Sequence, residues 1–83
     1  MDLQDYRKQI DKVDDEILRL FTERMRICGE IAGYKMQNNL PVFDAARERN
    51  KLANLYEKAD GDMRTYTNVL FSLLFELSRL HQK

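Results

Sequence analysis

A heptad pattern of apolar residues constrains the fold of this chain more than any other feature. Two rows recur every seven positions, namely Leu3, Ile10, Ile17, Arg24 and Ile31 in one row and Tyr6, Val13, Leu20, Ile27 and Tyr34 in the other. Such rows form the a/d seam that joins helices in a coiled coil. Because residues 2–38 contain no proline, the pattern predicts one helix from Asp2, which could cap its start, to about Asn38.

The predicted helix is too long for the rest of the chain to cover. About 35 residues at 1.5 Å per residue make a helix of roughly 50 Å. An 83-residue chain also buries only a modest fraction of its surface unless it associates with something. We therefore expect the seam to meet its copy in a second subunit.

Two shorter helices are expected after the long one. The stretch QNNLP, with the only proline, ends the first helix, and a second is predicted over about Asp44–Lys58, before the break at ADGD. A third is predicted over about Met63–Gln82, with Asp62 as its N-cap. This helix is the most apolar, so we expect it to be mostly enclosed. Strand alternation is absent, and residues 1–83 are predicted to form a single all-α domain.

Composition excludes several classes of function. The chain has 14 basic and 14 acidic residues, so no overall field favours nucleic acid or an anionic membrane. Cys28 is the single cysteine, and no apolar run resembles a membrane span or a signal peptide. No glycine-rich phosphate loop, activated nucleophile or array of metal ligands is found. We expect a cytoplasmic protein without a metal site.

Two cations on the long helix break its pattern. Arg24 occupies an a position, where a buried guanidinium without an anion would be costly, so Arg24 needs a counter-ion. Lys35 follows eleven residues later, only about 20° further around the helix. The pair therefore flanks a short apolar strip on one face. The alternative is a polar residue that sets the register of the seam, plus a solvated lysine near the helix end.

Polar groups at helical spacing also occur on the two shorter helices. Asp44, Arg47 and Glu48 stand at i, i+3 and i+4, which puts them on one face of the first turns. Ser78 and Gln82 repeat the i, i+4 spacing on the third helix. These groups suit a small molecule that carries carboxylates, because arginines bind carboxylates bidentately. The alternatives are an N-cap, surface pairs and a solvated helix end.

Arg7 stands apart from the other candidates. It precedes Arg24 by seventeen residues, which places it about 100° away around the helix. Within one straight helix it cannot easily join Arg24. In an antiparallel or crossed dimer it could reach the pocket of the partner; otherwise it is an ordinary surface charge.

Three stretches of the chain resemble the all-helical chorismate mutase family. They are RKQIDKVDDEILRLFTERMRICGEIAGYK, PVFDAARE and LFELSRLHQ, whose order and spacing cover nearly the whole chain. The resemblance implies an intertwined homodimer of three-helix chains with two active sites. It also implies a cofactor-free isomerase that converts chorismate to prephenate, in the shikimate route to phenylalanine and tyrosine.

The resemblance assigns roles at the substrate carboxylates and at the ether oxygen of the substrate. Arg24 matches the arginine that binds a substrate carboxylate, and Arg7 matches the arginine that the other subunit supplies. Lys35 and Gln82 match the two groups that flank the ether oxygen of the substrate.

The four remaining positions also match the family. Glu48 matches the acid that receives the ring hydroxyl. Arg47, Asp44 and Ser78 match the groups that orient Glu48, the connecting loop and the substrate carboxylates. No departure from the family pattern is found among these positions.

Two other functions remain open. An isochorismate-pyruvate lyase on the same fold would bind a similar dianion with the same cations. A non-catalytic helical dimerisation or regulatory module would share the fold, although a pure coiled coil gains nothing from Arg24 in its seam.

Overall fold

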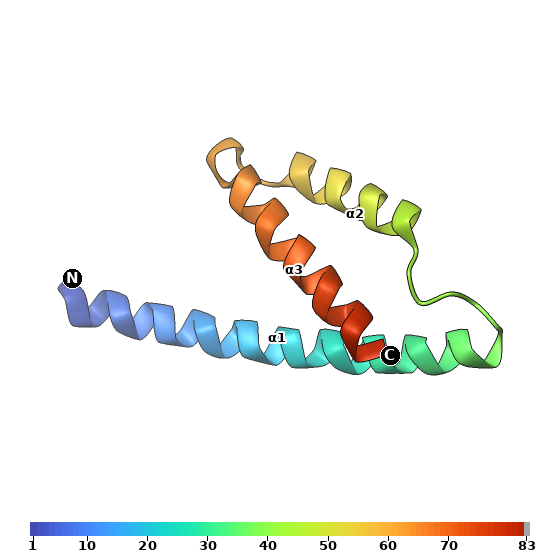
Figure 1. Cartoon of the computed structure of the whole chain (residues 1–83). Helices are drawn as coiled ribbons and strands as arrows, with labels where there is room; N and C mark the ends of the chain where they lie inside the picture. Colours follow the sequence, from blue (N-terminus) through green and yellow to red (C-terminus); the bar gives the residue numbers. More distant parts are fainter. Residues whose placement is uncertain (83) are drawn as a thin grey trace.

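The computed structural model describes residues 1–82, which form three α-helices (Figure 1). Helix α1 spans Leu3–Gln37, α2 spans Ala45–Lys58 and α3 spans Arg64–Gln82, with a short 3₁₀ helix, η1, at Gly61–Met63. No strand occurs among the described residues. The predicted all-α fold with a very long first helix is confirmed, and its helix ends lie within two residues of the predicted ones.

Helix α1 begins with a capping box. The Asp2 carboxylate accepts the backbone N–H of Asp5 at 3.0 Å, and the Asp5 carboxylate accepts the N–H of Asp2 at 3.1 Å. Each side chain satisfies a backbone donor that the first turn of a helix leaves unpaired. The predicted cap at Asp2 is confirmed.

A Schellman motif closes the other end of α1. Asn39 has a positive φ of 55°, the left-handed conformation that asparagine tolerates better than most residues. The N–H of Leu40 donates to the carbonyl of Lys35 at 2.8 Å, and the N–H of Asn39 donates to that of Met36 at 3.4 Å. The chain therefore changes direction just after Lys35 in the sequence. Lys35 is one of the predicted site residues.

We expect Asn39→Val to destabilise the fold by about 1–2 kcal/mol, because a β-branched residue is strained at positive φ. Asn39→Gly is the matched control, since glycine adopts this conformation without that strain. Urea unfolding followed by circular dichroism measures both changes. Equal stability of the two variants would show that the left-handed residue does not limit this turn.

The start of α3 differs from the prediction. Asp62 is not an N-cap: it lies inside η1, where the N–H of Met63 donates to the carbonyl of Asp60 at 2.8 Å. An N-cap needs an extended backbone, and Asp62 already belongs to a helical turn that leads directly into α3.

Helix α3 packs against both α1 and α2, which makes it the centre of the fold (Figure 1). The core is small: Cys28 of α1 and Phe75 and Ser78 of α3 are its buried side chains among the described residues. The radius of gyration is 16.0 Å, whereas a compact domain of this length would have one of about 12 Å. The chain is therefore elongated, measuring 54 × 26 × 16 Å.

Much apolar surface lies open on the single chain. The N-terminal half of α1 extends beyond the other helices (Figure 1). The aliphatic and aromatic residues of both seam rows are exposed, with Ile17 57% exposed. Within one chain the expected enclosure of α3 is wrong, since Val69 and Leu73 are 66% and 50% exposed. The reason is that α1 and α2 cover only the strip of α3 around Phe75 and Ser78.

Candidate active site

A cavity of about 320 Å³ lies where α3 meets α1 and the start of α2. Seven of the eight residues singled out from the sequence line it, namely Arg24, Lys35, Asp44, Arg47, Glu48, Ser78 and Gln82. They come from all three helices and from the α1–α2 connection. The apolar strip between the two cations of α1, Cys28 and Ile31, also faces the cavity.

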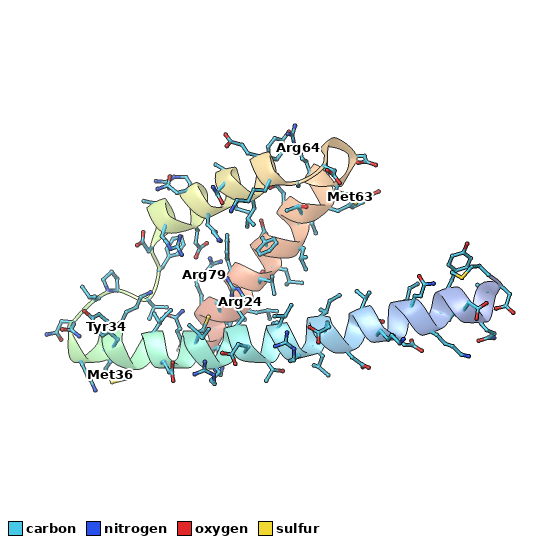
Figure 2. The ribbon with its side chains drawn as sticks, turned by 180° about the vertical axis from the view of Figure 1, so that it is seen from behind. Arg24, Tyr34, Met36, Met63, Arg64 and Arg79 are labelled. Atoms are coloured by element: carbon cyan, nitrogen blue, oxygen red, sulfur yellow. The ribbon has the colours of Figure 1, made fainter. Side chains whose placement is uncertain are left out.

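Arg24 lies at the crossing of α1 and α3 (Figure 2). Its guanidinium donates to the hydroxyl of Ser78 and lies 5.6 Å from the ring centre of Phe75. Ser78 in turn donates to the carbonyl of Leu74 at 2.7 Å. None of the ion pairs within residues 1–82 includes Arg24. The half-buried cation therefore meets a hydroxyl and a ring but no carboxylate of the described chain, which leaves it suited to an external anion.

Lys35 stands three turns further along the same face of α1. Its Nζ donates to the carbonyl of Val42 at 2.8 Å and to Oε1 of Gln82 at 3.4 Å. The first contact ties the lysine to the α1–α2 connection, and the second ties it to the last turn of α3. Lys35 is thus held at the point where three segments meet.

Asp44 begins α2 as an N-cap. Its Oδ1 accepts the backbone N–H of Arg47 at 3.0 Å. The N-cap, one of the alternatives that the sequence left open, is therefore confirmed for Asp44. The cap fixes the first turn of α2 at the cavity wall, and both side chains line the cavity.

Glu48 forms an ion pair with Arg79, a residue that was not predicted from the sequence. Nη1 of Arg79 lies 2.5 Å and 2.6 Å from the two carboxylate oxygens of Glu48, and the Arg79 guanidinium lies 5.0 Å from the ring centre of Phe43. A signal did exist, because Arg79 precedes Gln82 by three residues and so shares its side of α3. Lys51, three residues after Glu48, was also missed and lines the cavity.

The cavity carries an excess of positive charge. Five cationic side chains but only two carboxylates belong to its described lining. One of these carboxylates, Glu48, is already neutralised by Arg79. Such a lining favours a small dianion, since arginines and lysines bind carboxylates through charge-assisted hydrogen bonds.

Arg7 is the one predicted site residue that the structure does not bring to this cavity. It is exposed on α1, seventeen residues and about 25 Å of helix before Arg24. Within residues 1–82, no group of histidine, cysteine and carboxylate side chains is arranged to hold a metal ion. No helix in this part of the chain has both the length and the apolar character needed to cross a membrane.

Comparison with known proteins identifies relatives along the whole chain. A family model described as Chorismate mutase type II matches residues 6–83. A bifunctional chorismate mutase/prephenate dehydratase from Buchnera aphidicola is 36% identical over 85 residues, which cover 99% of this chain and 22% of the relative. A chorismate mutase from Methanocaldococcus jannaschii is 30% identical over 84 residues, 98% of this chain and 84% of the relative.

The relatives differ in length. A second bifunctional chorismate mutase/prephenate dehydratase, from Aquifex aeolicus, is 44% identical over 48 residues, 58% of this chain and 13% of the relative. The chain thus spans less than a quarter of these bifunctional relatives and most of the archaeal one. No solved structure matches the chain significantly.

Proposed function

The chain belongs to the chorismate mutase type II family, a family of isomerases, and we propose that it converts chorismate to prephenate in the shikimate route to phenylalanine and tyrosine. One observation carries the proposal. Arg24 and Lys35, two cations without a carboxylate partner among the described residues, line one cavity with Gln82 at its edge.

Lys35 and Gln82 act on the ether oxygen of the substrate. In this rearrangement a carbon–oxygen bond breaks while a carbon–carbon bond forms, so negative charge grows on that oxygen without any proton transfer. Donors fixed at that point stabilise the transition state more than the substrate. Gln82 turns Oε1 toward Lys35, and a rotation of its amide by about 180° makes it a second donor.

The arginines and Glu48 hold the substrate in its reactive shape. Arg24 binds one carboxylate. Arg47, Asp44 and Ser78, which line the same cavity, orient Glu48, the connecting loop and the substrate carboxylates. Glu48 accepts the ring hydroxyl. Holding a flexible dianion in a compact conformation removes part of the entropic barrier.

The active enzyme is a homodimer in which Arg7 completes the partner's site. Supporting this are the exposed seam residues of α1, the open apolar face of α3 and the large radius of gyration. A chain of this size buries only a modest fraction of its surface unless it associates with a partner. Arg7 lies too far from its own cavity to touch the same ligand. The cytoplasmic location stays a prediction from the sequence.

The first experiment is to incubate the purified protein with chorismate and follow its loss by absorbance, with identification of the product. Formation of prephenate is the expected result. Pyruvate release from isochorismate, without prephenate formation from chorismate, would favour the lyase. A folded dimer that turns over neither compound would favour a non-catalytic module.

A further inference from the structure

Arg79 reaches the cavity through a contact that the proposed mechanism leaves unused. It follows Ser78 on α3, and Figure 2 shows it near Arg24, whereas Arg64 lies at the opposite end of α3. Its partner is Glu48, the group to which the proposed function assigns the ring hydroxyl. The ion pair raises the question of how Arg79 affects Glu48 when Glu48 binds the substrate.

Arg79 is held from two sides. Its Nη1 contacts both oxygens of Glu48, and its guanidinium lies against the ring of Phe43. The side chains of Arg79 and Glu48 are only 32% and 24% exposed, so water screens this pair less than a surface pair. We call Phe43, Arg79 and Glu48 the Arg79 clamp. It connects α3, the α1–α2 connection and the first turn of α2.

We propose that Arg79 is a positioning residue that holds Glu48 in the orientation needed to receive the ring hydroxyl of the substrate; this inference rests on the proposed function. A carboxylate can accept two hydrogen bonds at each oxygen. Arg79 occupies one site on each oxygen of Glu48 and leaves the others for a ligand. Because a charged carboxylate only accepts, the clamp selects a ligand that presents a hydroxyl donor.

Direct binding of a substrate carboxylate by Arg79 is the competing explanation. In that case the effect of Arg79 on kcat/KM would not depend on Glu48. If Arg79 acts through Glu48, its removal changes nothing once Glu48 is absent. A double-mutant cycle separates the two, because it measures whether two residues act as one unit.

The single variants come first, with kcat and KM measured on chorismate. We expect Arg79→Met to lower kcat/KM by about 10- to 100-fold, the cost of a misplaced catalytic contact. Arg79→Lys should lose less activity than Arg79→Met, because one nitrogen makes both contacts with Glu48 and an ammonium can replace it, whereas the stacking on Phe43 is lost. Arg64→Met is the matched control: Arg64 stacks on Tyr56 at 4.8 Å, far from the cavity, and its loss should leave kcat/KM unchanged.

The cycle uses Glu48→Ala alone and combined with Arg79→Met. In the Glu48→Ala background we expect Arg79→Met to lower kcat/KM by less than about twofold. A substrate analogue without the ring hydroxyl gives an independent readout, since Arg79→Met should then have no effect on turnover. If circular dichroism shows that Arg79→Met does not fold, Arg79→Gln replaces it in the cycle.

Two results would overturn the inference in favour of a direct contact between Arg79 and substrate. One is that the two substitutions have additive effects on the activation free energy, and the other is that Arg79→Met lowers turnover of the analogue as much as turnover of chorismate. Unchanged activity of Arg79→Met would overturn it outright. Failure of the proposed function is a different result: in that case the wild-type protein itself would not turn over chorismate.

Discussion

Lys35→Ala is expected to lower kcat by about two to three orders of magnitude while KM changes little. The reason is that Lys35 meets charge that develops on the ether oxygen only in the transition state, and removing one such donor has this order of effect. The fold should survive, because Lys35 is only half-buried and its contacts are with Val42 and Gln82 at the cavity edge. Initial rates over a range of chorismate concentrations give both constants.

Lys12→Ala is the matched control for this experiment. Lys12 is exposed on the same helix and lies outside both seam rows. It should leave kcat and the thermal melting curve unchanged. If Lys35→Ala lost helicity in proportion to activity, its effect would be structural and the assignment of Lys35 to the ether oxygen would fail.

Mixing two inactive variants should restore activity. In a heterodimer of Arg7→Ala and Lys35→Ala chains, one cavity has an intact Lys35 and receives an intact Arg7 from its partner. Random exchange of subunits makes half of the dimers mixed, each with one complete site, so about a quarter of the sites become active. Each variant alone has no complete site. Activity before and after subunit exchange measures the recovery.

The control replaces the Lys35→Ala chain by one that carries both substitutions. Mixed dimers then contain no Arg7 at all, and no activity should return. If the single variants also fail to complement each other after proven exchange, Arg7 acts within its own chain or has no role in the site. The position of Arg7, about 25 Å of helix before Arg24, argues for the partner's cavity.

The sequence alone was sufficient for the helices and much of the cavity lining. The heptad rows predicted α1, Asp2 predicted its cap, and the i, i+4 spacing placed Ser78 and Gln82 on one face of α3. The N-cap at Asp44 was one of the alternatives that the sequence left open. These features depend on neighbours within about four positions, which is the range over which helix periodicity and capping act. Asp62 was misplaced because capping residues also occur inside short 3₁₀ turns.

Only the tertiary structure decided which distant groups meet. The Arg79–Glu48 ion pair joins positions 31 residues apart, and the contact between Lys35 and Gln82 joins positions 47 apart. Both require α3 to lie across α1 and beside α2, which no local pattern specifies. The exposed face of α3 has the same origin, since two helices cover only one strip of a third. Local hydrogen bonding and periodicity therefore determined the helices of this protein, and the packing of α3 between its two neighbours determined the arrangement of the site.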